Sequence, residues 1–151
     1  INVDAMGNTY GRTKDIIIVG KGNSNIDQIV ESAAKQDKKY VEADAEPEKG
    51  YFYRSDHFEF AKMGVPALYV DGGIDVRGKN KEFGKLKKNE YTENHYHSLS
   101  DEILDEWTYD GMIEDNKILF RVGYAISQHD EWPTWNEGTE FKAVRETMLT
   151  K

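Results

Sequence analysis

The chain has 151 residues, of which 38% are hydrophobic and 12% aromatic, and this is the composition of one globular domain. Its formal net charge of −8 argues against nucleic acid or an anionic membrane as a partner. The absence of cysteine excludes disulfide bonds, a thiolate nucleophile and thiolate metal ligands, and no apolar run approaches the roughly 20 residues that a membrane span needs.

The first predicted element is a strand. Apolar and polar residues alternate over residues 1–6, and Asp4 is one of the polar ones. Because aspartate is rare in strands, we expect Asp4 to lie at the end of this strand or to have a partner there. The sequence begins inside the strand and without Met, so we expect a trimmed product or a piece of a longer protein.

A strand–helix–strand unit follows. Residues 15–19 are a run of β-branched residues behind an aspartate, which predicts a strand covered on both faces. Ser24 is predicted to cap a helix that reaches about Gln36, with Asp27 at the reciprocal position of a capping box. Residues 40–43 form the next short strand, and this order of elements predicts a parallel pair of strands.

A short helix and a further strand come next. Ser55 is predicted to cap a helix over residues 56–63, and Gly64 suits the position just after its end. Asp56 and His57 open this helix, where the simplest interpretation is a capped helix with a half-buried histidine. Residues 65–70 are predicted to form the next strand, with Pro66 tolerated near its start.

Residues 71–92 are predicted to form a long loop, because they are rich in glycine and lysine, and such loops are usually functional or mobile. The loop leads to His95 and His97, which a run of hydroxyl residues and an aspartate follow, as in metal-binding or acid–base sites. The alternative is a surface loop in which Ser100 caps the next helix, with Asp101 and Glu102 in its first turn. Residues 107–128 form the longest predicted helix, with an apolar stripe along one side.

Three predicted elements thus carry unusual polar residues: Asp4, the Asp56–His57 pair, and His97. In an open α/β sheet, ligands bind outside the carboxyl ends of the strands. Taken singly, each of these residues has a simpler structural explanation. Their coincidence predicts that they share one edge of the sheet.

Four segments in order, residues 2–7, 54–58, 64–67 and 96–101, resemble successive motifs of the co-catalytic di-zinc aminopeptidases. That group includes bacterial leucyl aminopeptidases, aminopeptidase Y, glutamate carboxypeptidase II and glutaminyl cyclase. The resemblance implies an α/β fold with a three-layer, mainly parallel sheet flanked by helices. Residues 1–128 would be the C-terminal portion of the peptidase domain and residues 129–151 a C-terminal tail, which resembles that of secreted bacterial members.

The resemblance also implies roles for individual residues. Asp4 matches a carboxylate ligand of one zinc and His97 an imidazole ligand of the other. Ser55, Asp56 and His57 match a supporting turn beside the site, and Tyr96 would line the entrance to the side-chain pocket. The two zincs would polarise the scissile carbonyl of a peptide substrate, activate a water and hold the free amine.

The family's first histidine ligand, its bridging aspartate and its Glu-Glu pair all precede the segment that Asp4 matches. We therefore expect a C-terminal half that by itself is inactive, binds zinc weakly and self-associates through an exposed sheet edge. A metal-free, transferrin-receptor-like binding domain is one alternative, although it gives no chemical reason to retain Asp4 and His97. A glutaminyl cyclase-like enzyme with one metal is another. The family implies a periplasmic or secreted location.

Overall fold

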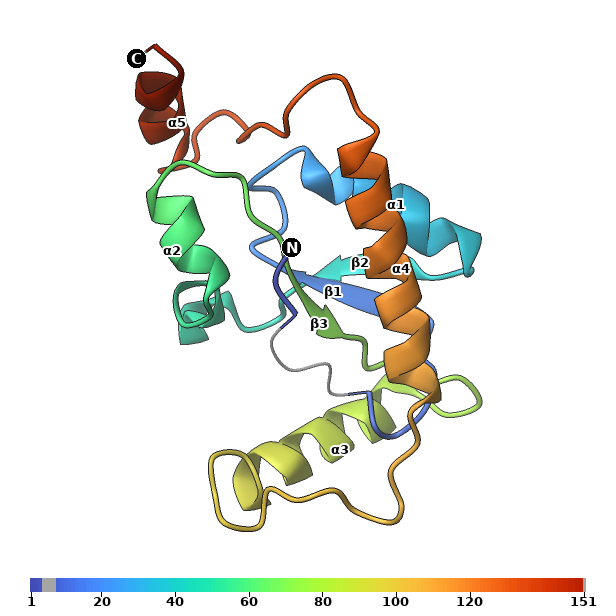
Figure 1. Cartoon of the computed structure of the whole chain (residues 1–151). Helices are drawn as coiled ribbons and strands as arrows, with labels where there is room; N and C mark the ends of the chain where they lie inside the picture. The colour runs from blue at the N-terminus through green and yellow to red at the C-terminus, as the bar shows by residue number, and fades with distance from the viewer. Residues whose placement is uncertain (4–7, 151) are drawn as a thin grey trace.

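The computed structural model describes residues 1–3 and 8–150, which form an α/β fold around a small sheet (Figure 1). Its strands are β1 (Asp15–Val19), β2 (Tyr40–Ala43) and β3 (Tyr69–Gly72), in the order β2-β1-β3. The predicted strand–helix–strand unit is confirmed, because β1 pairs in parallel with β2 and helix α1 (Ile26–Gln36) connects them. β3 pairs with β1 in the antiparallel direction, so the described sheet is mixed where a mainly parallel one was expected.

The N-terminal residues lie beside β3. The backbone N–H of Asn2 donates to the carbonyl of Leu68 at 2.8 Å, and Asn2 pairs in parallel with Tyr69. The predicted strand over residues 1–6 is therefore represented by one bridge, because residues 4–7 are outside the described part. The strand predicted over residues 65–70 begins only at Tyr69.

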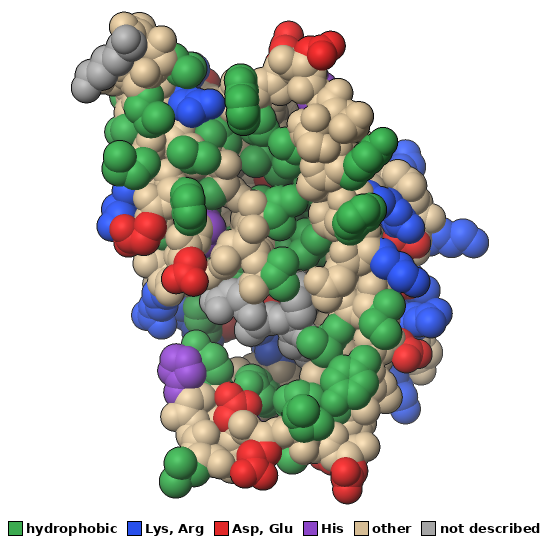
Figure 2. Space-filling view, in the orientation of Figure 1, with side chains coloured by type: hydrophobic (Ala, Val, Ile, Leu, Met, Phe, Trp, Pro, Cys, Tyr) green, Lys and Arg blue, Asp and Glu red, His purple; other side chains and the backbone are tan. Residues whose placement is uncertain are grey.

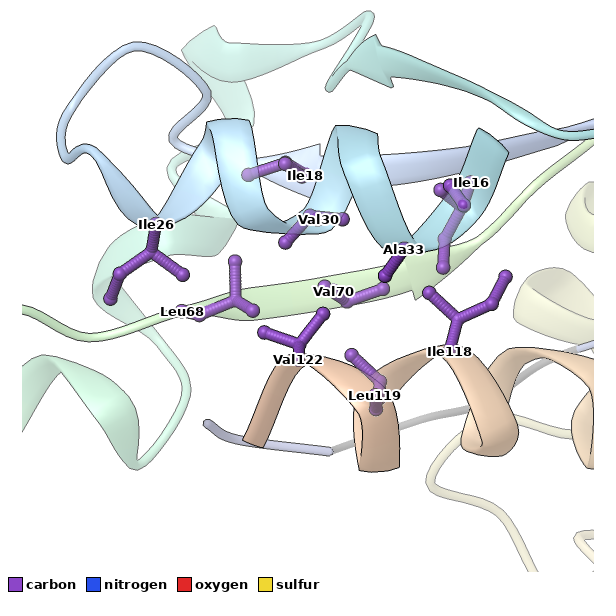
Figure 3. Packing of buried hydrophobic residues seen from close by; sticks show 11 residues of the cluster. Ile16, Ile18, Ile26, Val30, Ala33, Leu68, Val70, Ile118, Leu119 and Val122 are labelled. Carbon is purple, nitrogen blue, oxygen red and sulfur yellow. The ribbon is translucent and has the colours of Figure 1, made fainter. Parts of the chain in front are cut away.

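One face of the sheet is covered by α1 and by α4 (Asp110–Ser127). Figure 3 shows side chains of both helices meeting around Val70 of β3. All five residues of β1 are buried, as expected for a strand covered on both faces. The apolar stripe predicted for the long helix is confirmed by Leu119 and Val122, although the helix begins at Asp110 instead of residue 107. The buried cluster consists of Ile16, Ile18, Ile26, Val30, Ala33, Ala34, Leu68, Val70, Ile118, Leu119 and Val122.

The opposite face is covered by α2 (His57–Lys62) and by the segment after α4, which ends in α5 (Lys142–Leu149). Two 3₁₀ turns, Pro47–Lys49 and Tyr51–Tyr53, lead into α2. The indole of Trp135 is buried there, and its Nε1 donates to the carbonyl of Gly64 at 3.0 Å. Gly64, the residue after the C-cap Met63 of α2, has φ +78°, which confirms its predicted place beyond the end of the helix. The buried hydrophobic cluster on this face consists of Val19, Phe52, Ala61, Tyr69, Trp135 and Phe141.

The cap predicted for α1 is wrong by one residue. Asn25 is the N-cap, whereas Ser24 only accepts a hydrogen bond from the Ile26 N–H at 3.3 Å. The side chain of Asn25 accepts from the Thr134 N–H at 2.9 Å, so it is occupied by the C-terminal segment and makes no cap hydrogen bond. Asp27 accepts from the Gly22 N–H at 2.5 Å, outside the helix.

The long loop predicted over residues 71–92 is also wrong, because helix α3 spans Lys81–Asn94. The prediction gave too much weight to glycine, whereas lysine and glutamate, which favour helices, make up half of α3. The Asn80 side chain caps the helix by accepting from the Phe83 N–H at 2.9 Å. Gly84 lets α3 lie directly against the backbone of Ile74, since a Cβ at position 84 would be 2.1 Å from the Ile74 carbonyl oxygen.

We expect Gly84→Ala to destabilise the protein although alanine is the better helix former. The Cβ would overlap a backbone oxygen, and such overpacking costs about 1–3 kcal/mol, more than the ~1 kcal/mol that the helix gains. Gly123→Ala in α4 is the matched control, because its Cβ would meet Ile1 at an ordinary 3.5 Å. Urea unfolding should give opposite signs for the two variants. A Gly84→Ala protein as stable as the Gly123→Ala protein would contradict the close approach of α3.

Candidate functional site

The predicted histidine-containing stretch forms a turn, residues 95–101, that directly follows α3. Nδ1 of His95 lies 2.8 Å from the carbonyl of Ser100, so this nitrogen carries the donated hydrogen. The Ser100 hydroxyl donates back to the Asn94 carbonyl at 2.7 Å, and the Tyr91 phenol donates to Asp101 at 2.8 Å. These bonds fix the shape of the turn. Ser100 is not the cap of the following helix, as the alternative interpretation required, because α4 begins only at Asp110.

His97 lies within this turn in the left-handed backbone conformation, which is uncommon for residues other than glycine. Its φ is +57°, and Lys38 is the one other described residue besides glycine with a positive φ. Its side chain is exposed, and its ring stacks on that of Tyr96 with 3.9 Å between centroids. Figure 2 shows histidine side chains at the lower left, over the segment that follows α3 and beside a hollow in this face. Such backbone strain in an exposed turn is typical of functional positions.

Ser55 contacts the segment that leads to Asp4. Its hydroxyl accepts a hydrogen bond from the Asn2 side-chain amide at 2.5 Å, and Ser55 is buried. The prediction that Ser55 caps α2 is wrong, because that helix starts at His57 and Asp56 is its N-cap. The hydroxyl instead supports residues 1–3. Asp4 itself lies outside the described residues, so its predicted approach to His97 stays a prediction.

His57 and Asp56 have different environments. His57 is 3% exposed and packs against the rings of Phe52 and Tyr69, with centroids 4.6 and 5.2 Å away. Asp56 is exposed, and the structure shows no hydrogen bond from it to the described residues of the 95–101 turn. We expected a hydrogen bond from Asp56 or His57 to the turn that carries His97. For Asp56, no such hydrogen bond is found among the described residues.

The described residues do not form a complete metal site. Within the two ranges 1–3 and 8–150, no three histidine, aspartate or glutamate side chains are grouped so that they could hold a metal ion. The carboxylate of Asp4 and the imidazole of His97 are donors of the kind that zinc prefers, but a catalytic zinc usually takes about three protein ligands. None of the described helices has the length and apolarity that a membrane crossing requires.

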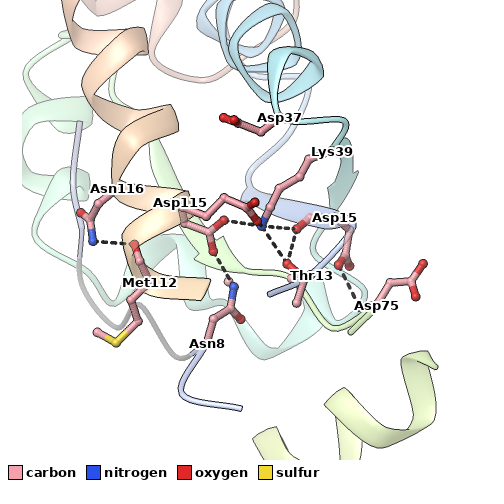
Figure 4. Close-up of polar contacts among 12 residues, drawn as sticks. Asn8, Thr13, Asp15, Asp37, Lys39, Asp75, Met112, Asp115 and Asn116 are labelled. Atoms are coloured by element: carbon pink, nitrogen blue, oxygen red, sulfur yellow. Dashed lines mark hydrogen bonds and ion pairs between the residues drawn. The ribbon is translucent and has the colours of Figure 1, made fainter. Parts of the chain in front are cut away.

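A buried polar network, absent from the sequence predictions, holds the chain that follows residues 4–7 (Figure 4). The ammonium group of Lys39 lies 2.5 Å from Asp115 and 2.9 Å from the Thr13 hydroxyl, with no exposed side-chain area. Asn8 donates to the other carboxylate oxygen of Asp115. Glu114, 3.3 Å from Lys39, adds a second carboxylate. The network thus ties the loop after Asp4 to α4 and to the start of β2.

One signal in the sequence could have revealed this network. Asp115 lies three residues after Met112 and three before Ile118, on the apolar stripe of the long helix. A carboxylate at such a position is buried and needs a cationic partner. Lys39, immediately before β2, was not distinguishable as that partner because Lys38 stands next to it.

Burial raises the pKa of Asp115 to about 6, although Lys39 and Asn8 oppose the rise; nearby Glu114 adds to it. The folded carboxyl thus holds its proton more tightly than the unfolded one, whose pKa is about 3.9. Its contribution to stability is complete below pH ~4 and is lost as the pH rises through ~6.

We therefore expect the difference in unfolding free energy between the wild type and Asp115→Asn to fall from pH ~4 to ~6 and then to level off. Urea unfolding of both proteins over this range measures this difference. Subtracting one unfolding free energy from the other cancels the pH dependence that the other carboxylates contribute to both proteins. A carboxyl NMR titration with a midpoint at or below ~4 for Asp115 would contradict this expectation, because it would show that Lys39 and Asn8 outweigh the effect of burial.

Comparisons with known proteins place most of the chain in one family. The model of peptidase family M28 matches residues 1–120, a range that contains Asp4, Ser55, His57 and the 95–101 turn. No curated protein and no solved structure matches the chain.

Proposed function

The chain belongs to peptidase family M28, and on this basis we propose that it is part of a zinc-dependent aminopeptidase that removes N-terminal residues from peptides. One observation of the structure supports the proposal most directly. His97 is exposed at φ +57° in a turn whose hydrogen bonds hold it there, so an imidazole is presented to solvent by a rigid support.

In this proposal, Asp4 and His97 each give one ligand to one of two zinc ions. Bound zinc would polarise the scissile carbonyl of the substrate and activate a water. Ser55 supports the strand that leads to Asp4, and Tyr96, stacked on His97, would border the substrate's side-chain pocket. In this proposal, the remaining ligands and the general base would come from outside the described residues.

We further propose that residues 1–128 are the C-terminal portion of the peptidase domain, with residues 129–151 as a tail. The parallel pairing of Asn2 with Tyr69 supports a larger, three-layer and mainly parallel sheet that continues past residues 1–3. Ile1 and Val3 are 52% and 44% exposed at this edge, so the chain alone would self-associate there. A periplasmic or secreted location rests on the resemblance to secreted aminopeptidases.

The proposal predicts contrasting behaviour of the 151-residue chain and the complete protein. The complete protein should cleave leucine p-nitroanilide, lose this activity with a chelator and regain it with zinc. The 151-residue chain should show no turnover and only weak zinc binding by calorimetry, since it offers each zinc one ligand where about three are usual. A complete protein that cleaves no aminoacyl substrate would refute the proposed activity. Tight two-zinc binding by the chain alone would refute the ligand assignment.

A further inference from the structure

We propose that a cavity at the opposite end of α3 from the 95–101 turn, near the N-terminal ends of α3 and α4, binds a small organic oxyanion, a carboxylate or a phosphate. The cavity has a volume of about 480 Å³, within the ~300–1,000 Å³ typical of small-molecule sites. Its wall includes three cationic side chains, Arg12, Arg77 and Lys79, and one acid, Asp110. Such an excess of positive charge is unusual in a chain whose net charge is −8.

Asp110 does not neutralise this charge. Its carboxylate lies 3.8 Å from Nε of Arg12, and the two side chains are 64% and 55% exposed. Exposed pairs at such distances contribute about 0–1 kcal/mol, so an incoming anion can displace Asp110 from the guanidinium. Arg12 is therefore available to a ligand.

Arg77 is held in place before any ligand arrives. Its Nε donates to the Thr13 carbonyl at 3.2 Å, and its Nη2 lies 3.1 Å from both the Asp37 carbonyl and Glu114. Glu114 also contacts the buried ammonium group of Lys39, which pairs with Asp115 as well, so the charges of Arg77 and Lys39 are balanced by these two carboxylates and the excess positive charge of the cavity comes from Lys79 and the weakly paired Arg12. The backbone N–H of Arg77 donates to the Arg12 carbonyl at 2.8 Å, which ties the two walls of the cavity together. A pre-positioned guanidinium loses little entropy when it binds an oxyanion.

Lys79 is the third cation, and no described carboxylate lies within ion-pair distance of it. Its ammonium group lies 5.4 Å from the centre of the Phe83 ring, which gives the cavity an apolar wall. Tyr10 also lines the cavity and donates its hydroxyl to the Gly73 carbonyl at 2.9 Å. Burial and nearby carboxylates raise the pKa of Tyr10, so the phenol stays neutral and does not repel an anion.

Together these features define the ligand. Guanidinium groups bind carboxylate and phosphate oxygens in a forked geometry, and Lys79 adds a point charge. The volume exceeds that of a bare ion, and the Phe83 and Tyr10 rings suit an organic body attached to the anionic group. None of these residues is assigned to the zinc site, so the inference does not depend on the proposed peptidase activity.

The test is a titration of the chain with succinate and, separately, with inorganic phosphate at low salt, followed by backbone NMR. We expect saturable shifts at Arg12, Lys79 and Phe83 with at least one of the two anions, and the responsive anion identifies the ligand class. Lys79→Gln should lower the affinity about tenfold or more, because a hydrogen bond to a charged group contributes ~1.5–3 kcal/mol. Lys117→Gln, an exposed lysine of α4 outside this cavity, is the control and should leave the affinity unchanged.

Both substituted lysines are exposed, so both variants should fold, which their thermal unfolding midpoints would verify. The absence of saturable shifts with either anion would overturn the proposal. So would shifts that map elsewhere, or equal affinities of the Lys79→Gln and wild-type proteins.

Discussion

Replacing Lys39 with methionine is expected to lower the free energy of unfolding by about 3–5 kcal/mol at neutral pH, the usual cost of removing one partner of a buried ion pair. The ammonium group of Lys39 has no exposed area and contacts Asp115 at 2.5 Å and Glu114 at 3.3 Å. Methionine fills a similar volume, so the variant isolates the charge from the packing. Both carboxylates would then be buried near each other without the cation that lies between them. Urea unfolding monitored by circular dichroism measures the loss.

Lys35→Met is the control, because Lys35 is an exposed lysine in the last turn of α1 and its loss should change stability by no more than ~0.5 kcal/mol. The double variant Lys39→Met/Asp115→Leu should recover part of the loss, since it removes a carboxylate together with its partner. A Lys39→Met protein within ~1 kcal/mol of the wild type would show that water reaches the network.

Under the proposed function, replacing His97 with glutamine is expected to reduce both the zinc affinity and the kcat/KM of the peptidase by more than ~100-fold. Loss of a residue that only supports a metal ligand costs about 10–100-fold, and loss of a ligand should exceed that range. The side chain is exposed, and among the described residues its ring stacks on that of Tyr96, so the substitution should leave the fold intact. Zinc content by mass spectrometry and hydrolysis of leucine p-nitroanilide give the two readouts.

His129→Gln is the matched control, since His129 is exposed beyond the end of α4 and outside the turn. It should retain full activity and zinc. If His97→Gln retained both as well, His97 would not be a zinc ligand, whereas membership of the peptidase family would be unaffected.

The sequence alone determined those features that depend on neighbouring residues. The β-branched run of β1, the periodic apolar residues of α1 and the stripe of α4 each predict an element and its buried face, because period and local propensity act within a few residues. The ordered motifs around Asp4 and His97 also predicted the peptidase family that residues 1–120 match. Each of these features depends on residues that are close together in the sequence.

Only the tertiary structure decided which distant groups meet. Serine is a common helix cap, but the Ser55 hydroxyl instead accepts a hydrogen bond from the side chain of Asn2, 53 positions away. Lys39 and Asp115 are 76 positions apart, and nothing local distinguishes Lys39 from Lys38. The antiparallel direction of β3 likewise depends on how the chain returns to β1. A hydrogen bond or ion pair acts over a few ångströms in space, and its partner is set by packing and not by separation along the chain.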